Sequence, residues 1–374
     1  MSESSLAREF VARFLAEGDP SRAELLLLTF SGSSQCSWDR VLAYAAREKV
    51  LPTVGQKLCQ LRLCDRLPPD LADFFRGLQE LSLSRNRLFI AESAKIARLL
   101  NRVGVEPVAL KGAAYVLTGV HPEPSSRFMR DLDFLITDSK TDEAIDVLQS
   151  NGYSIANQNP YRVSHHSPPI RSANGIIVEL HQSLGLGRCP EILPARQVIE
   201  SSTPMEIEGA RVRVPLREHL ITHHIMHSQI HDSYSERIWP SLRAMYDLVL
   251  LGHYCKEDST AIWAAVMERF RENGSLDLLA AHLSLVEKTF EVKFPCIFPD
   301  SRALQLRNFH RTILRRFPFI RHIDPIYFAS AAVVPRLRIV NNIARIPGGW
   351  KYLAKTPFRS SFYRHLLDDV MVKR

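Results

Sequence analysis

The chain has 374 residues, of which 45% are hydrophobic and 24% are charged, a composition typical of folded globular proteins rather than disordered ones. Its six cysteines include no Cys-x-x-Cys pair, which argues against a zinc ribbon, and no apolar run approaches the roughly 20 residues of a membrane span. The N-terminus carries no apolar signal segment. We therefore expect a cytoplasmic protein with reduced thiols.

The net charge of +8 is concentrated at the C-terminal end. Residues 305–374 contain 14 Lys and Arg against three Asp, a net charge of +11, so the first 304 residues carry −3. Such a basic tail suits an anionic membrane surface, a nucleic acid or an acidic partner protein, and a location peripheral to a membrane stays open. A set of solvated helix faces explains it equally well. Because the rest of the chain is not basic, a template-reading polymerase is disfavoured.

Residues 1–104 are predicted to be an N-terminal helical region. Apolar and charged residues alternate with helical spacing in Asp39–Glu48 and Pro69–Leu81. A longer helix is expected from Leu83 to Val103, and Gly104 ends it.

Residues 105–216 have the pattern of a small α/β core. Short apolar or β-branched runs predict its strands, and Gly112–Leu117 and Ala144–Leu148 predict helices between them. The dipeptide Asn174-Gly175 is typical of a hairpin turn. The expected strands are Pro107–Leu110, Asp133–Ile136 extended back to Asp131, Ile176–His181 and Val212–Pro215.

Residues 217–300 are predicted to be helical again and to pack on this core. Residues 301–374 form the basic tail, which five prolines divide into short helices. The expected fold class is therefore α+β, with a small mixed-sheet core between N-terminal and C-terminal helical regions. The helices expected after residue 216 are Glu218–Ile230, Ile238–Tyr254, Thr260–Arg271 and Leu276–Phe290.

Asp131 and Asp133 are the first candidates for chemistry. Side chains alternate along a strand, so two carboxylates two residues apart point the same way. They repel each other unless a cation neutralises them, and Mg²⁺ favours carboxylate oxygens together with substrate phosphates. Taken alone, Asp-x-Asp is also compatible with a solvated pair at the edge of a sheet.

Two neighbouring segments strengthen the case for a metal and nucleotide site. Lys111 and Gly112 lie at a strand-to-helix junction, where glycine lets phosphate approach the backbone and lysine adds positive charge. Glu179 lies inside an apolar strand, where a carboxylate is costly without a partner. His181 follows two residues later and shares its face.

These parts, in this order, resemble the nucleotidyltransferase superfamily of the DNA polymerase β type. More narrowly, Val108–Tyr115, Arg127–Ile136 and Val178–His181 resemble a bacterial family of uncharacterised nucleotidyltransferases, with its Leu-Lys-Gly, Arg-x-x-x-Asp-x-Asp and Glu-Leu-His elements. The similarity extends over roughly residues 40–295. The later helical region matches through His223, His227, Trp239 and Asp247-Leu248.

The resemblance implies a transferase that moves a nucleoside monophosphate from an NTP to a hydroxyl of an unidentified acceptor. Asp131 and Asp133 would hold two Mg²⁺ ions, with Mn²⁺ as an alternative, and Glu179 would complete the metal site or accept a proton. The superfamily's phosphate turn usually has a serine, which is absent here. The nucleotide-binding candidates that the resemblance implies are Lys111, Gly112, Arg127 and Arg130.

His219, His223 and His227 are spaced by four and share a helix face. Zinc binding, a wall of the substrate site and ordinary packing are all compatible with this spacing, and His181, His223 and His227 are our candidates for the acceptor site. Two other functions keep the same fold: phosphoryl transfer, and a non-catalytic nucleotide-binding or antitoxin-like module. The three intact carboxylates favour an enzyme.

Overall fold

A computed structural model describes residues 3–34, 36–156, 166–185, 187–231, 240–296 and Phe298. The predictions for the basic tail, residues 301–374, lie outside the described residues, as does Trp239.

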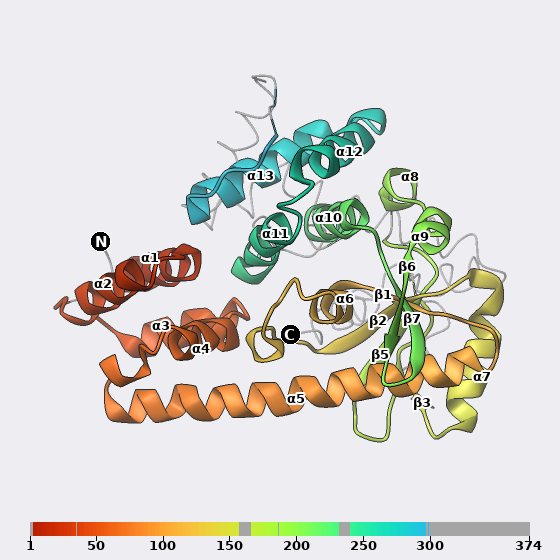
Figure 1. Ribbon diagram of the computed structural model, residues 1–374, viewed down its shortest axis with the longest axis horizontal. Helices are drawn as coiled ribbons and strands as arrows, with labels where there is room; N and C mark the ends of the chain where they lie inside the picture. Colours follow the sequence, from red (N-terminus) through yellow and green to blue (C-terminus); the bar gives the residue numbers. More distant parts are fainter. Residues whose placement is uncertain are drawn as a thin grey trace, which may run out of the picture.

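The centre of the described fold is a seven-stranded sheet in the order β3-β4-β5-β2-β1-β7-β6 (Figure 1). Strand β2 is parallel to β5 and β1 is parallel to β7, whereas the other neighbours are antiparallel. The prediction of an α+β fold with a mixed sheet is confirmed. The strands are β1 (Val108–Ala109), β2 (Asp131–Leu135), β3 (Ser154–Ile155), β4 (Ile170–Arg171), β5 (Ile177–His181), β6 (Thr203–Ile207) and β7 (Ala210–Val214).

Asn174-Gly175 forms the turn of the β4–β5 hairpin, as the sequence predicts. Gly175 has a φ of 78°, in the left-handed region where glycine is favoured. Its amide donates to the carbonyl of Ser172 at 2.9 Å, and the Ser172 hydroxyl accepts from the amide of Ile176. The turn therefore sets where β5 begins, and with it the positions of Glu179 and His181.

The N-terminal helices lie beside and below the sheet in Figure 1. The largest difference from the prediction is α5, which is one helix of 33 residues rather than two. Its N-terminal half packs on α4 and its C-terminal half packs under β7 and α7 (Figure 1), so tertiary packing continues the helix through Gly77 and Leu81-Ser82-Leu83. These helices are α1 (Glu3–Ala16), α2 (Pro20–Ser31), α3 (Trp38–Arg47), α4 (Leu51–Gln60) and α5 (Pro69–Asn101).

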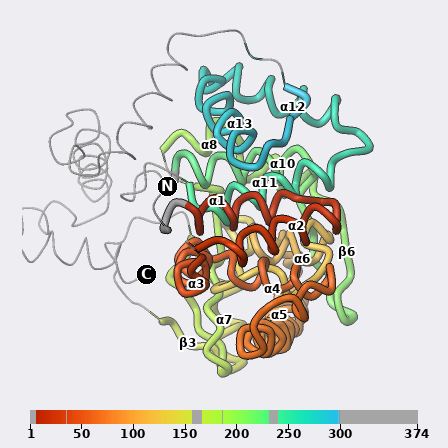
Figure 2. Tube along the Cα trace, turned by 90° about the vertical axis from the view of Figure 1, so that its left-hand side faces the viewer, coloured from red at the N-terminus to blue at the C-terminus, as the bar shows by residue number. Residues whose placement is uncertain are grey.

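The C-terminal helices lie at the opposite end of the molecule from α5, which Figure 2 shows nearly end-on. They correspond closely to the predicted helices, and a π-helical turn, His227–His231, extends α10. No helix in the described ranges is both long and apolar enough to cross a bilayer. The remaining helices are α6 (Lys111–Leu117), α7 (Thr141–Ser150), α8 (Cys189–Ile192), α9 (Ala195–Ser201), α10 (Arg217–Met226), α11 (Leu242–Tyr254), α12 (Ser259–Glu272) and α13 (Leu276–Phe290).

Candidate active site

Strands β2 and β5 lie side by side at the middle of the sheet and bring the predicted acidic residues together. Their parallel register pairs Asp133 with Glu179 and Leu135 with His181. Paired residues of neighbouring strands face the same side, so Asp131, Asp133, Glu179 and His181 share one face. The other face of both strands is fully buried core, formed by Leu132, Phe134, Val178 and Leu180.

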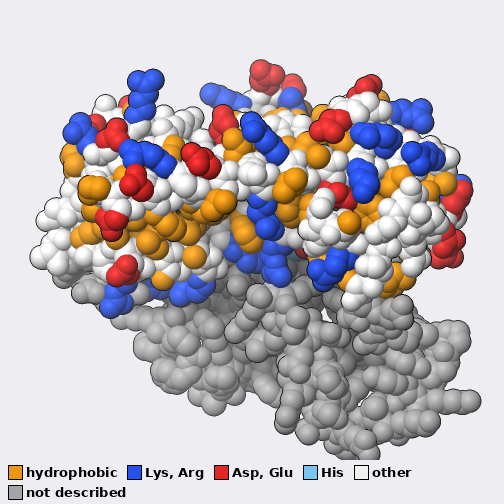
Figure 3. Space-filling model, turned by 90° about the horizontal axis from the view of Figure 1, so that it is seen from below, with side chains coloured by type: hydrophobic (Ala, Val, Ile, Leu, Met, Phe, Trp, Pro, Cys, Tyr) orange, Lys and Arg blue, Asp and Glu red, His pale blue; other side chains and the backbone are white. Residues whose placement is uncertain are grey.

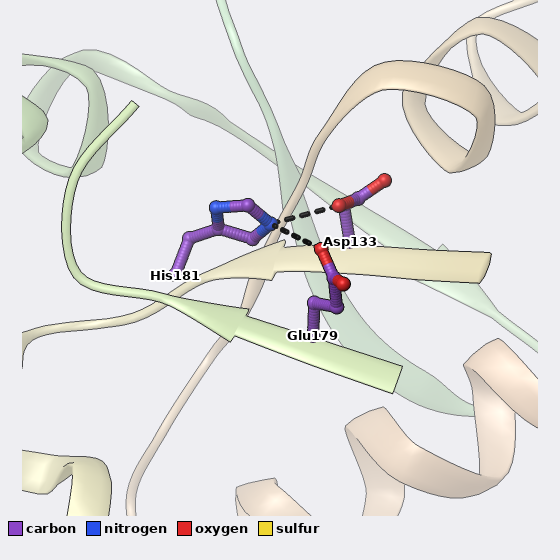
Figure 4. Close-up of side chains that lie close together, drawn as sticks. All are labelled: Asp133, Glu179 and His181. Atoms are coloured by element: carbon purple, nitrogen blue, oxygen red, sulfur yellow. Dashed lines mark hydrogen bonds and ion pairs between the residues drawn. The ribbon is translucent and has the colours of Figure 1, made fainter. Parts of the chain in front are cut away.

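Asp133, Glu179 and His181 converge at short distances (Figure 4). His181 Nε2 donates to Asp133 Oδ1 at 2.7 Å and lies 3.8 Å from Glu179 Oε2. All three side chains are buried. Among the described residues, this is the one group of three side chains whose ligand atoms could hold a metal ion, and those atoms lie within 4.8 Å of one another.

His166 is a further member of this cluster, although no local pattern in the sequence marks it as part of a site. An isolated bridge pairs it with His181, and the structure buries it. Its Nδ1 donates to the carbonyl of Ser167 at 2.6 Å, and its Nε2 lies 3.6 Å from Glu179 Oε2. His166 therefore lies against Glu179, on the same side of the sheet as His181.

Lys111 supplies the positive charge of the site. Its ammonium donates to Asp133 Oδ1 at 2.8 Å. The backbone at Lys111 has a φ of 46°, which a side chain with a Cβ rarely adopts, and such strain is concentrated at functional sites. This turn directs the lysine from the end of β1 toward β2.

Lys111 and Asp133 each stabilise the charged form of the other. Burial alone would lower the pKa of Lys111, but the charges of Asp133, Glu179 and Asp131 raise it. Burial alone would raise the pKa of Asp133, but Lys111 and His181 hold it well below its usual range. Asp133 is therefore a carboxylate and Lys111 an ammonium ion at neutral pH.

Gly112 follows Lys111, and the structure gives a packing reason for a glycine there. A Cβ at this position would lie 2.5 Å from Arg127 Nη1 and 3.2 Å from Met129 Cγ. The glycine thus lets the Arg127 guanidinium approach the backbone of α6. The role of Gly112 in binding phosphate stays a prediction.

Arg127 lies in a buried network rather than at the surface. Its Nη2 donates to Asp247 Oδ2 at 2.9 Å, and its guanidinium stands 5.1 Å from the ring centroid of Tyr115. His121 Nε2 contacts the other oxygen of Asp247 at 2.8 Å. No local motif marks His121 as a functional residue or gives Asp247 a role, because their partners are distant in the sequence. Contact between Arg127 and a triphosphate stays a prediction.

The segment that leads into β2 is held from below by α5. Arg85 donates to the carbonyl of Met129 at 2.9 Å, and Asn86 donates to the carbonyl of Arg127 at 2.7 Å. Arg130, which follows, is exposed beside the half-buried Asp131. Of the two predicted arginines, Arg130 is therefore the one that can contact a phosphate from solvent, because Arg127 is buried.

The three histidines on the α10 face separate into two environments. His219 contacts Ser201 and Arg269 at 3.4 Å each, away from the acidic cluster. His223 is buried, and its burial, together with the neighbouring His227, Lys111 and His181, holds its pKa well below the usual range. The His227 ring meets the His223 ring edge-on at 6.2 Å. His223 therefore adjoins the cluster, and His227 is in contact with His223.

His224 makes the stability of the folded protein depend on pH. Its Nε2 donates to the carbonyl of Ala244 at 2.7 Å, so its Nδ1 accepts from the Tyr115 hydroxyl at 2.9 Å. Burial lowers the pKa of His224 to about 4. Below pH 6.5 this histidine becomes protonated in the unfolded chain, whereas in the folded protein it stays neutral until about pH 4. The free energy of unfolding therefore falls as pH drops from 6.5 towards 4.

We expect this group to contribute up to about 3 kcal/mol to that loss by pH 4, and about 2 kcal/mol between pH 7 and pH 5. Urea unfolding of wild type and His224→Gln at pH 7 and pH 5 measures it. The variant should lose less stability between the two pH values than wild type does. Equal losses in both proteins would contradict the assignment.

A lysine, two carboxylates and histidines buried together on one face of a sheet form an enzyme site rather than a packing feature, because such groups perturb one another's protonation. The sequence matches, over residues 34–291, the family described as uncharacterised nucleotidyltransferase. This span includes most of the chain and every residue of the site. The chain belongs to this family and is a transferase.

Two solved structures share broad similarity with the chain. The antibiotic-resistance factor ANT(2'')-Ia is 12% identical, covering 53% of this chain and 98% of that one, with a TM-score of 0.34. An antigenic nucleotidyltransferase-like protein from Paracoccidioides brasiliensis is 15% identical, covering 55% and 94%, with a TM-score of 0.32. No curated protein matches the sequence. At such low TM-scores neither structure bears on the substrate of this chain.

Proposed function

We propose that the protein transfers a nucleoside monophosphate from an NTP to a hydroxyl group of an acceptor, with release of pyrophosphate. The register that places Asp133 beside Glu179, with Asp131 on the same face, carries the proposal. Two adjacent strands thereby present carboxylates to one point, as divalent-cation-dependent phosphate chemistry requires. Membership of the family supports the same reaction class.

The residues present fit a divalent cation. Bonds of about 2.1 Å in an octahedron place neighbouring ligand atoms about 3 Å apart. The 2.7 Å and 3.8 Å separations of His181 Nε2 from Asp133 and Glu179 bracket that value. Asp133, Glu179 and His181 would hold one ion once Nε2 of His181 has given up its proton, and Asp131 with Asp133 would hold a second beside the triphosphate. Such ions stabilise the attacking and leaving oxygens of an in-line displacement.

The chain's own residues prepare the site for the donor and the acceptor. Lys111 neutralises Asp133 and lies beside the site's entrance, since its side chain is 22% exposed. When a cation binds Asp133 in place of Lys111, the lysine ammonium can therefore contact a phosphate oxygen instead. Glu179 accepts the proton of the acceptor hydroxyl. His223 offers the acceptor a hydrogen-bonding group, because its Nε2 has no hydrogen-bond partner among the described residues.

The test uses one NTP labelled at two positions. Nucleotidyl transfer moves the α-phosphorus to the acceptor and releases pyrophosphate, whereas phosphoryl transfer moves the γ-phosphorus and releases NDP. Each NTP is incubated with Mg²⁺ or Mn²⁺ and with sugars, aminoglycoside-like compounds, proteins and RNA ends as acceptors. Transfer of the γ-label would replace the proposed reaction. Nucleotide binding without transfer to any acceptor would favour the non-catalytic module.

The imidazole in the donor set leads to a prediction about the metal. Nitrogen ligands suit transition metals better than Mg²⁺, which prefers oxygen. We expect Mn²⁺ to bind more tightly than Mg²⁺ in wild type, and His181→Gln to lose that preference by about tenfold in Kd. Mn²⁺ binding is followed by electron paramagnetic resonance, where coupling to an imidazole nitrogen should disappear in the variant.

His219→Gln is the matched control, because His219 faces Arg269 rather than the cluster. It should keep both the Mn²⁺ affinity and the nitrogen coupling. Nitrogen coupling that persists in His181→Gln would show that another histidine binds the ion.

A further inference from the structure

The outer side of α5 carries large apolar side chains in a single row. Phe74, Leu81 and Leu88 expose 43%, 72% and 55% of their surface. They are seven residues apart, which is almost two helical turns, so they lie along one line of the helix. Isolated exposed leucines need no explanation, but a contiguous apolar row on a helix marks an interaction site.

A row of small residues runs beside the large one. Gly77, Ser84 and Ala91 each follow a large residue by three positions, so the two rows occupy the a and d positions of a heptad pattern. Ser84 and Ala91 are exposed, and a Cβ added at Gly77 would meet no atom within 4 Å. Along the outer face of α5, large side chains that project from the helix thus alternate with small residues that leave open space.

We propose that this face pairs with α5 of a second copy of the chain in an antiparallel, two-fold arrangement. In an antiparallel helix pair, an a residue of one helix faces a d residue of the other. An axis between Ser82 and Leu83 then places every large residue against a small one. The layers are Phe74 on Ala91, Leu81 on Ser84 and Leu88 on Gly77 of the second copy. A parallel pair would instead set large against large and small against small.

The charges beside the row fit the same arrangement. The axis brings Glu80 next to Arg87 of the second copy, and the symmetry repeats this pair on the other side. Both side chains are exposed, and neither forms an ion pair with another residue in the described part of the chain. Figure 3 looks onto the side of the molecule that carries α5, where apolar side chains are bordered by both signs of charge.

The contact region is short. Residues 74–91 span about 27 Å of helix, so two such helices bury less than a standard stable interface. We therefore expect a dimer that dissociates on dilution. The dimer is independent of the proposed reaction, because Asp133, Glu179 and His181 all come from one chain and none of them lies on α5.

Sedimentation velocity over a wide range of concentrations tests the proposal with the full-length chain. Wild type should shift from monomer to dimer as concentration rises, and Leu81→Glu should stay monomeric. Leu25→Glu on α2 is the matched control, since Leu25 is 65% exposed and lies outside the row; it should dimerise like wild type. A wild type that is monomeric throughout, or a dimer that survives Leu81→Glu, would overturn the proposal.

Charge exchange tests the register. Glu80→Arg or Arg87→Glu places like charges together twice and should raise the dimer Kd by about tenfold or more. The double variant Glu80→Arg/Arg87→Glu should return to the wild-type Kd. Failure of the double variant to recover would contradict the two-fold register.

Cross-linking tests the direction. Gly77→Cys/Leu88→Cys should form a disulfide between position 77 of one copy and position 88 of the other under mild oxidation, as mapped by peptide mass spectrometry. Gly77→Cys alone should give no link between the two positions 77, which the axis keeps about 16 Å apart along the helix. A 77-to-77 link would show parallel pairing and overturn the proposal.

Discussion

Asp133→Asn is expected to lower kcat/KM for nucleotidyl transfer by about 10²–10³-fold or more. Asp133 holds the centre of the site, because its Oδ1 accepts from both Lys111 and His181 and its strand neighbour is Glu179. The amide has no charge for a cation, and its NH₂ group cannot accept from Lys111. The substitution thus removes the metal ligand and the partner of the lysine in one step.

The measurement is release of labelled pyrophosphate, or metal-dependent nucleotide binding until the acceptor is found. Asp146→Asn is the matched control, because Asp146 is exposed on α7, and it should behave like wild type. Asp133→Glu should also be impaired, since the longer side chain moves the carboxylate away from the point where Glu179 and His181 meet. Transfer that is unchanged in Asp133→Asn with unaltered unfolding temperature would contradict the metal site.

The acidic face was predictable because it depends on short-range rules. Alternation along a strand puts Asp131 and Asp133 on one side, and Asn174-Gly175 determines where β5 begins. The sequence could not show that Asp133 lies directly beside Glu179, since this requires β2 and β5 to be neighbours. It also could not show that Lys111 reaches Asp133 rather than only a phosphate, because that contact depends on a left-handed backbone at a non-glycine residue.

The parts that escaped prediction depend on distant residues. Arg127 and Asp247 are 120 positions apart, and no spacing pattern connects a loop before β2 with the middle of α11. No local pattern marks His166, whose place beside the acidic residues depends on its bridge to His181, 15 positions further along the chain. The continuity of α5 depends on the α4 and β7 surfaces against which its two halves pack, which local propensity does not record.

Asp247→Asn is expected to destabilise the folded protein by about 3–5 kcal/mol, the usual cost of leaving a buried charge without its partner. Asp247 is 2% exposed and binds both Arg127 and His121. The bond joins α11 to the segment that leads into β2, so its loss should also disorder the position of Asp131 and Asp133. Urea unfolding measures the first effect, and kcat/KM measures the second.

The double variant Arg127→Met/Asp247→Leu separates the charge from the packing. Replacing both partners by apolar side chains removes the unpaired charge, so the double variant should be more stable than the sum of the single changes predicts. If the stability losses of the two single variants add up to the loss of the double variant, the two residues act independently. That result would contradict their contact at 2.9 Å.

Acidic pH should reproduce part of the effect of Asp247→Asn. Burial alone would raise the pKa of Asp247, but Arg127 and His121 hold it far below the ordinary value. A lowered pKa in the folded state stabilises the protein above the unfolded pKa of about 4, and this contribution is lost as pH falls below that value. Wild type should therefore lose stability between pH 4 and pH 2 more steeply than Asp247→Asn. If both proteins show the same slope, Asp247 is not the carboxylate that ties the helical region to the catalytic core.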